Sequence, residues 1–146
     1  MYCNQKGNNM TNQKGNNMTK EKTDLLTKDI CARLLHNVKC LVSFDDGTKE
    51  IMTLKTGLPN SFGNWDFYNE NCSGCSNKFK PYLRSMYTMT DEETKEYLGM
   101  LNDIDKSGLM NQSFITKVVD WLDKKMFDHR GLIPMGIALE ASEGMY

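Results

Sequence analysis

Residues 38–56 read VKCLVSFDDGTKEIMTLKT, and their pattern decides the fold. In the first half, apolar side chains recur at every second residue, which is the period of a β-strand with one buried face. These residues are Val38, Cys40, Val42 and Phe44. A turn signal, Asp-Asp-Gly, follows at residues 45–47, and KEIMTLKTG then returns as a second strand. The stretch therefore predicts a β-hairpin.

The segment before the hairpin has the spacing of a helix instead. In DLLTKDICARLLHN, Leu26, Ile30 and Leu34 recur at i, i+4 and i+8, with Leu25 and Cys31 alongside. Thr23 or Asp24 is suited to cap the first turn. We expect an amphipathic helix that starts near residue 23.

A second helix is predicted in TDEETKEYLGMLND. Thr90 and Glu93 have the spacing of a capping box, in which each side chain satisfies a backbone N–H of the first turn. The expected buried stripe is Tyr97, Leu98 and Leu101.

A third helix is predicted over residues 113–127, whose apolar side chains fall on one face. They are Ile115, Val118, Val119, Leu122 and Met126. Gly131 is expected to end this helix in the left-handed conformation, with Leu132 folding back onto the last turn and Pro134 preventing continuation.

These elements predict a small single α+β domain over residues 23–146, a short antiparallel β-hairpin or sheet packed with about three α-helices. Residues 57–80 are expected to hold a long loop plus one more short strand, because Gly, Asn and Ser dominate there. Residues 1–22 are predicted to be a disordered tail or an arm that orders on contact with a partner. They contain two identical tandem copies of NQKGNNMT, which has almost nothing to bury.

Composition excludes some functional classes. The net charge of −1 gives no general attraction to nucleic acid or to an anionic membrane, so a nucleic-acid partner is not expected. No apolar run approaches the ~20 residues that span a bilayer, and the N-terminus lacks the apolar core of a signal peptide. We therefore expect a cytoplasmic protein whose five cysteines stay reduced.

The pair Cys72 and Cys75 forms a C-x-x-C, the weak metal candidate of the chain. A structural zinc site needs four ligands, and the sequence offers no second close pair. Cys31 and Cys40 complete a set only if a helix and a strand bring them to the same place. A thioredoxin-like role needs the pair at a helix N-terminus after a strand, which this Asn- and Ser-rich loop does not provide. Two reduced thiols are the preferred interpretation.

Residues 103–114 resemble the first half of an EF-hand loop. Asp103, Asp105 and Ser107 stand at its first, third and fifth ligand positions, and Gly108 stands at the turn. The twelfth position should supply a bidentate Glu and instead holds Phe114. The segment is predicted to be a helix-linking turn, and no motif in the chain implies a cofactor.

The polar run Asp128-His129-Arg130 is the candidate ligand- or partner-binding site, together with Trp121 and Lys125. At a helix end, His129 and Arg130 would meet the negative end of the helix dipole. In a binding loop, they would meet an anion or an acidic partner. No catalytic residue is assigned, because no recognisable Ser or Cys nucleophile motif accompanies the histidine.

Three segments, KDICARLLHNVKC, FKPYLRSMYTMTDEE and DWLDKKMFDHRGLIPMGIALEASEGMY, resemble a family of small proteins encoded in phages and prophages of gut bacteria. The ending is the most specific part. The tandem repeat and the C-x-x-C are not features of that family. No activity is established for it, so no site residues carry over. The resemblance implies an accessory factor of a mobile element.

The leading hypothesis is a non-enzymatic accessory binding protein, such as an inhibitor of a host defence system or a sequestering protein for a nucleotide signal. Its partner would be a host protein or a small nucleotide, and the oligomeric state stays open. One alternative is a small hydrolase or nucleotide-processing enzyme that uses His129 with Asp128 or Asp120. Another is a nucleic-acid-binding regulator using two basic clusters, Lys78, Lys80 and Arg84, and Lys124, Lys125 and Arg130.

Overall fold

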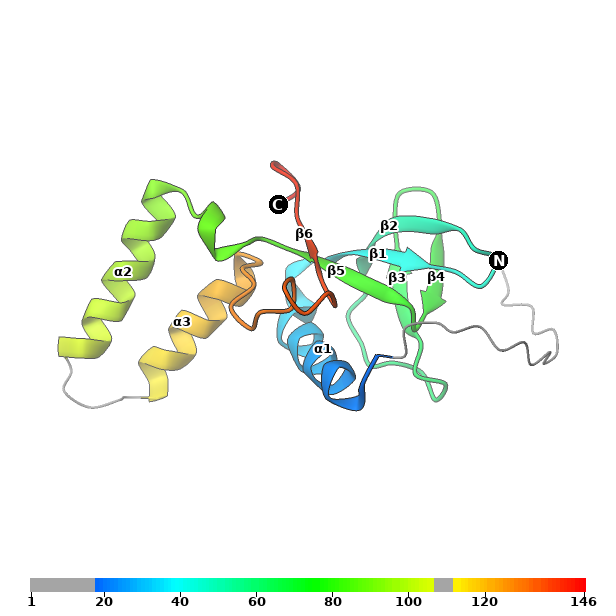
Figure 1. The fold of residues 1–146 in the computed structure, drawn as a ribbon, viewed down its shortest axis with the longest axis horizontal. Coiled ribbons are helices and arrows are strands. Elements are labelled where there is room, and N and C mark those ends of the chain that lie inside the picture. Colours follow the sequence, from blue (N-terminus) through cyan, green and yellow to red (C-terminus); the bar gives the residue numbers. More distant parts are fainter. Residues whose placement is uncertain (1–17, 107–111) are drawn as a thin grey trace.

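The computed structural model describes residues 18–106 and 112–146 as a small α+β domain (Figure 1). Its elements are α1 (Lys20–Arg33), β1 (Lys39–Ser43), β2 (Lys49–Leu54), β3 (Trp65–Tyr68), β4 (Ser73–Ser76), β5 (Phe79–Leu83), α2 (Asp91–Lys106), α3 (Gln112–Lys124) and β6 (Leu139–Glu140). The six strands form one sheet in the order β4-β3-β2-β1-β5-β6. All neighbours are antiparallel except β5 and β6, which are parallel. The predicted fold class is confirmed.

The predicted hairpin is β1 and β2, at the centre of the sheet. Cys40 pairs with Met52, and both side chains are buried. The turn between the strands is held by Asp46, whose carboxylate accepts hydrogen bonds from the backbone N–H and the hydroxyl of Thr48 at 2.9 and 2.6 Å. Gly47 has a φ of +87°, which a side chain would strain.

Residues 57–80 contain more strand than expected. Both β3 and β4 form there as a second hairpin, and β5 begins at Phe79. The Asn69 side chain closes the turn by accepting hydrogen bonds from the backbone N–H groups of Asn71 and Cys72. Position 74 on β4 requires a glycine, because a Cβ atom there would lie 2.9 Å from the Phe44 ring.

Helix α1 packs on the sheet through Leu26 and Ile30, as predicted. It begins earlier than expected, at Lys20, and its N-cap is Thr19 instead of Thr23 or Asp24. The predicted boundary at residue 23 therefore falls inside the helix. Residues 1–17 of the predicted tail lie outside the described residues.

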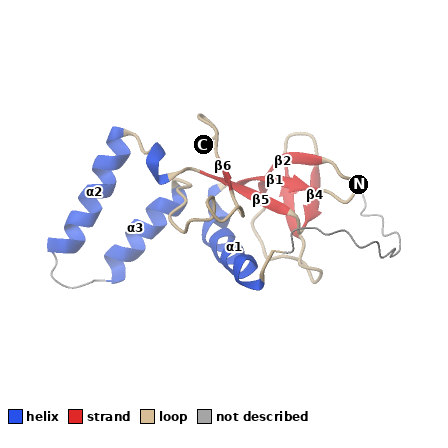
Figure 2. Cartoon of the chain, viewed as in Figure 1, coloured by secondary structure: helices blue, strands red, loops and turns tan. Residues whose placement is uncertain are grey.

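Helices α2 and α3 form a hairpin that projects from one end of the sheet (Figures 1 and 2). The capping box is confirmed, because Thr90 Oγ1 accepts from the Glu93 N–H and Glu93 Oε2 accepts from the Thr90 N–H. The predicted stripe is only partly right. Tyr97 contributes to the core of the hairpin, whereas Leu98 and Leu101 are 57% and 38% exposed.

The end of α3 corrects the sequence prediction. The helix stops at Lys124, and Met126, with a φ of +61°, takes the left-handed position that was expected for Gly131. The N–H of Phe127 donates to the Leu122 carbonyl, and that of Met126 to the Asp123 carbonyl, which is the Schellman pattern. Leu132 does not fold back onto α3 but is fully buried in the core between α1 and the sheet.

The base of the α2–α3 hairpin is a single β-bridge just beyond the end of β5. The chain leaves β5 at Arg84 and returns at Phe127, and these two residues form an isolated parallel bridge. Arg84 N–H donates to the Met126 carbonyl at 2.7 Å, and Asp128 N–H donates to the Arg84 carbonyl at 2.8 Å. In the part of the chain that is described, no helix has the length and apolar character needed to cross a membrane.

Candidate functional site

The central feature of the molecule is a buried charge cluster where α1 meets the end of α3. It contains Asp29 and Arg33 from α1, Asp123 from α3, and His129 and Arg130 from the following turn. The side chains of Asp29 and Arg33 have no exposed surface, and that of Asp123 is 4% exposed.

Arg33 ties the two helices together. Its Nε and Nη2 donate to the two carboxylate oxygens of Asp29 at 2.9 and 3.0 Å. Its Nη1 and Nη2 also donate to the backbone carbonyls of Asp123 and Phe127 at 3.3 and 2.8 Å. These carbonyls also accept hydrogen bonds from the backbone N–H groups of Met126 and His129, respectively. Arg33 therefore adds a second donor to each carbonyl and joins α1 to the turn that follows α3.

Arg130 and His129 complete the cluster from the other side. Arg130 Nη1 contacts the Oδ1 atoms of both Asp29 and Asp123 at 2.8 and 2.6 Å. His129 Nε2 lies 2.8 Å from Asp123 Oδ1, so its N–H donates in the tautomer that carries hydrogen on this atom. The carboxylates and guanidiniums compensate one another inside the cluster.

The pKa values of the cluster follow from these contacts. Burial by itself would raise the pKa of Asp123, but the hydrogen bonds from His129 and Arg130 and the charges of Arg33 and Arg130 outweigh it and hold that pKa well below its usual range. For Arg130, burial opposes the charge, yet Asp123 and Asp29 raise the pKa above its ordinary value. Both groups are therefore charged near neutral pH.

The enzyme hypothesis pairs His129 with Asp128 or Asp120, and neither carboxylate contacts His129 in the structure. The carboxylate of Asp128 instead accepts hydrogen bonds from the backbone N–H groups of Leu132 and Ile133 at 2.7 and 2.8 Å. Asp120 is exposed on α3. The acid beside His129 is Asp123.

Trp121 and Lys125 belong to a separate aromatic stack. Trp121 lies between Tyr97 of α2 and Phe127, with ring centroids 6.1 and 5.8 Å away and interplanar angles of 19° and 22°. The Arg84 guanidinium covers the Phe127 ring at 4.3 Å. Trp121 Nε1 is buried, and no hydrogen-bond partner for it is found within the described ranges. Lys125 Nζ lies 5.8 Å from the Trp121 ring centre.

Arg84 also fixes the start of α2. Its two Nη atoms donate to the two carboxylate oxygens of Glu93 at 2.9 and 2.7 Å, and Nη2 donates to the Thr88 carbonyl. Arg84 is the main cause of the low pKa of Glu93, about 2 against an ordinary 4.5. The backbone N–H of Thr90 and the charge of Lys125 act in the same direction, and burial opposes them.

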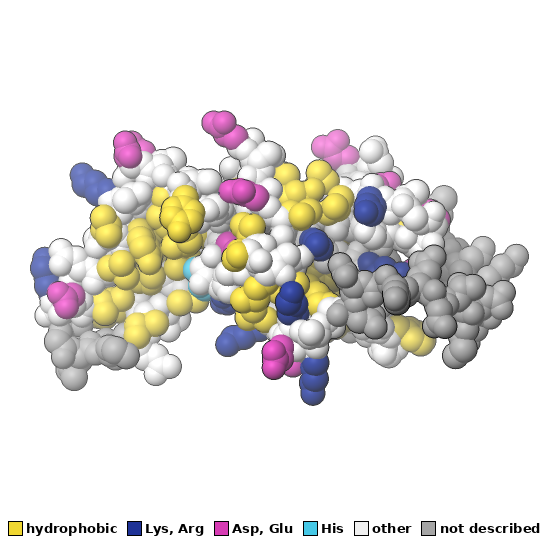
Figure 3. Space-filling model, viewed as in Figure 1, with side chains coloured by type: hydrophobic (Ala, Val, Ile, Leu, Met, Phe, Trp, Pro, Cys, Tyr) yellow, Lys and Arg dark blue, Asp and Glu magenta, His cyan; other side chains and the backbone are white. Residues whose placement is uncertain are grey.

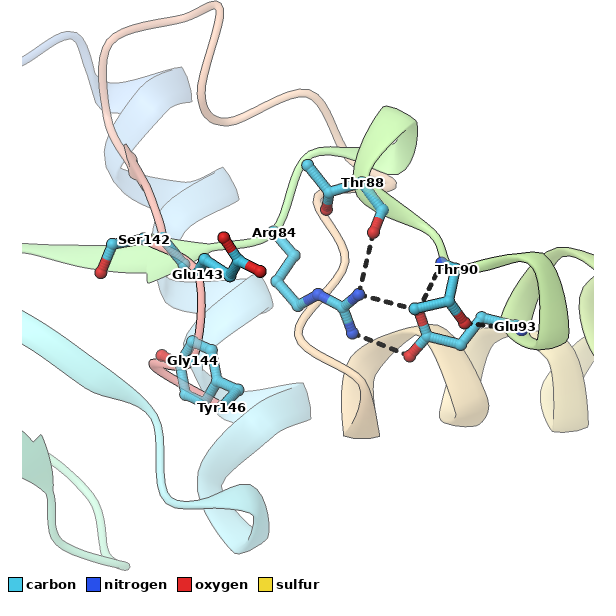
Figure 4. A pocket seen from close by; sticks show the side chains of 9 residues that line it. Arg84, Thr88, Thr90, Glu93, Ser142, Glu143, Gly144 and Tyr146 are labelled. Carbon is cyan, nitrogen blue, oxygen red and sulfur yellow. Dashed lines mark hydrogen bonds and ion pairs between the residues drawn. The ribbon is translucent and has the colours of Figure 1, made fainter.

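A cavity of about 500 Å³ lies between the start of α2 and the last residues of the chain (Figure 4). The Arg84–Glu93 pair, Thr88 and Thr90 form one wall, and residues 141–144 and Tyr146 form the other. The Tyr146 hydroxyl donates to the Tyr82 carbonyl at 2.9 Å, which holds that wall to the sheet.

The cysteines lie apart from these sites. Cys72 is exposed beside the edge strand β4, with Sγ 3.5 Å from a carboxylate oxygen of Glu50, and Cys75 is half-buried within that strand. Partial desolvation of the thiol, followed by the hydrogen bond and charge of Glu50, raises the pKa of Cys72. Cys31 is exposed on α1, and Cys40 is buried in β1. Within residues 18–106 and 112–146, no group of three or more His, Cys, Asp or Glu is placed to hold a metal. The predicted turn at residues 103–114 lies partly outside the described residues.

The basic clusters are partly neutralised. Arg84 pairs with Glu93, Arg130 with Asp29 and Asp123, and Lys125 with Glu93 at 3.5 Å. Lys78 pairs with Asp45 at 3.2 Å on the surface, while Lys80 and Lys124 are exposed.

The hairpin exposes apolar surface. Its core has three buried residues, Val118, Leu122 and Phe127, and six partly buried ones, Met86, Met89, Tyr97, Met100, Ile104 and Trp121. Leu98, Leu101 and Ile115 are exposed beyond this core. Figure 3 shows hydrophobic side chains gathered over α2 and α3. We call Leu98, Leu101 and Ile115 the hairpin patch.

The residues that sequence reasoning missed are Asp29, Arg33 and Asp123. A signal for them exists, because residues 29 and 33 share the face of Leu26 and Ile30 on α1. Charged residues on a buried helical face indicate internal pairing.

Comparisons of the chain with protein-family models, with curated proteins and with solved structures find no match.

Proposed function

We propose that this chain is a non-enzymatic accessory binding protein that recognises a protein partner through its α2–α3 hairpin. The observation that carries the proposal is the hairpin patch on an element that projects from the sheet. Exposed apolar side chains gathered on one element are typical of a protein-interaction site. The three methionines at the edge of the hairpin core, Met86, Met89 and Met100, add an adaptable apolar border.

The charge cluster supports binding over catalysis. Arg33 and Arg130 each make ion pairs with both Asp29 and Asp123, so these four groups already have partners inside the protein. They hold the hairpin against α1 and so give the hairpin patch a fixed position.

A narrower form of the proposal is the inhibition of a host defence protein. It rests on the resemblance of residues 120–146 to proteins encoded in phages and prophages. In that setting, a small binding protein would act on a protein of its host.

The test is a comparison of three immobilised proteins in a lysate of a gut bacterium. These are the native chain, Leu98→Ser with Leu101→Ser, and Ile51→Ser as a matched control, since Ile51 is 49% exposed on β2. We expect mass spectrometry to identify a protein that the native chain and the control retain and the hairpin variant loses. Equal retention by all three proteins would contradict the proposal. So would turnover of a cyclic or ADP-ribose-derived nucleotide that His129→Ala abolishes.

A further inference from the structure

We infer that the partner of the hairpin patch is a cationic amphipathic helix, an inference that rests on the proposed function. Leu98 and Leu101 lie three residues apart on α2 and therefore next to each other on its surface. An i, i+3 ridge of this kind packs against the groove of another helix, with apolar anchors on the partner.

The charge of α2 determines which sign of charge is expected on the partner helix. The helix contains six acidic residues and two lysines, and only Glu93 of the six acids has an ion pair within the described part of the chain. Asp91 and Asp105 lie seven residues to either side of Leu98, which is about two helical turns, so they share its face. The two lysines of the helix lie near these acids in sequence, Lys95 four residues after Asp91 and Lys106 directly after Asp105.

Helix α3 offsets this field only in part. Its two lysines and Asp120 carry a net charge of +1, since Asp123 is neutralised in the buried cluster, whereas α2 keeps a net charge of −3 after Glu93 is paired with Arg84. Charges on α2 act over roughly 8 Å at physiological salt, which is far enough to reach the flanks of a helix seated on Leu98 and Leu101. Lysines or arginines on those flanks would complement α2.

The same charges argue against a second copy as the occupant. In a two-fold symmetric dimer the same patch faces itself, so the acidic α2 would meet another acidic α2. Like charges that face each other across an interface weaken it.

The experiment uses the full chain and three labelled amphipathic peptides of about 18 residues, or five helical turns. All three peptides have the same leucine face. The remaining positions are all lysine in the first peptide, all glutamine in the second and all glutamate in the third. Fluorescence anisotropy gives the affinity of each peptide for the native chain, for Leu98→Ser with Leu101→Ser, for Asp91→Asn with Asp105→Asn, and for the control Ile51→Ser. Circular dichroism checks that each variant is folded.

We expect the lysine peptide to bind at least about tenfold more tightly than the glutamine peptide, a difference of about 1.4 kcal/mol. The leucine variant should lose this binding, the asparagine variant should weaken it about threefold, and the control should keep it. Binding should also weaken between roughly 50 and 300 mM salt.

Three results would overturn the inference, and they separate it from the proposed function. If the glutamine or glutamate peptide binds as tightly, the hairpin takes helices without regard to charge, and the proposed function stands. If the lysine peptide binds the leucine variant equally well, the attraction is not at the hairpin patch. If sedimentation shows a dimer that the leucine variant dissociates, the occupant is a second copy. Equal retention of lysate proteins by the native chain and the leucine variant would instead remove the proposed function itself.

Discussion

Arg33 and Asp29 lie one turn apart on α1, joined by two hydrogen bonds of 2.9 and 3.0 Å, with both side chains fully shielded from solvent. Because Arg33 also donates to two carbonyls at the end of α3, it connects helices that are about 90 residues apart in the chain. Removing one partner of a buried ion pair leaves the other charge uncompensated.

Arg33→Ala should therefore lower the free energy of unfolding by about 3–5 kcal/mol, as is typical of a broken buried ion pair. Urea denaturation followed by circular dichroism measures the change. Lys28→Ala, at an exposed position of the same helix, is the control and should change it by less than about 0.5 kcal/mol. A loss no larger than that of the control would show that Arg33 does not hold α1 to α3.

Stability should also depend on pH through Glu93. Its pKa is about 2 in the folded protein and ordinarily 4.5, so the unfolded chain binds the proton more tightly. The stabilisation is complete above about pH 4.5 and is lost as the pH falls toward 2. Asp123 shifts in the same direction, which extends the loss to lower pH.

Glu93→Gln should lower the free energy of unfolding at neutral pH, and its curve should approach that of the native chain as the pH falls. Urea midpoints measured from about pH 7 to about pH 2.5 give both curves. Glu92→Gln, at an exposed neighbour, should leave the native curve unchanged. Parallel curves for Glu93→Gln and the native chain would contradict the role given to Arg84.

Two glycines should respond to alanine with opposite signs. At Gly74, the added Cβ would lie 2.9 Å from Phe44, whose ring packs on the core, so Gly74→Ala should destabilise the protein by about 1–3 kcal/mol. At Gly99 on α2, a Cβ meets nothing within 4 Å, so Gly99→Ala should stabilise it by about 0.5–1 kcal/mol. Thermal unfolding of the two variants gives the signs, and the same sign for both would refute the prediction.

Trp121→Phe should be nearly neutral, within about 1 kcal/mol, because it keeps a ring in the stack and removes a buried N–H that lacks a partner in the described structure. Trp121→Ala should cost about 3–5 kcal/mol, since it leaves a cavity between Tyr97 and Phe127. Denaturant unfolding separates the two outcomes. Equal losses would mean that the indole N–H has a partner after all.

Local signals made the central hairpin and the start of α2 predictable. The alternation in β1 and the Thr90–Glu93 capping box depend on residues that are close in sequence. Strand β4 was missed because Ser73-Gly74-Cys75-Ser76 has little β-propensity and is held in the sheet by its pairing with β3.

The end of α3 was misplaced for a similar reason. Glycine is the usual residue at a left-handed stop, so Gly131 was favoured over Met126. In the structure, Met126 is 1% exposed, and the burial of its side chain in the main core offsets the cost of the left-handed conformation. Local sequence does not reveal the charge cluster, because the acid that contacts His129 is Asp123, six residues earlier in the last turn of α3, which is shared with Arg33 and Arg130.

The parallel pairing of β5 with β6 has a consequence for changes in the lengths of the helices. Tyr82 and Leu83 pair directly with Leu139 and Glu140, so residues 84–138 connect two adjacent strands, and within this connection the Arg84–Phe127 bridge closes the base of α2 and α3. Because both ends of this inner segment meet at one bridge, α2 and α3 can gain or lose whole turns away from it without shifting the register of the strands. Matched changes in the lengths of α2 and α3 should therefore leave the strand pairing of the sheet unchanged.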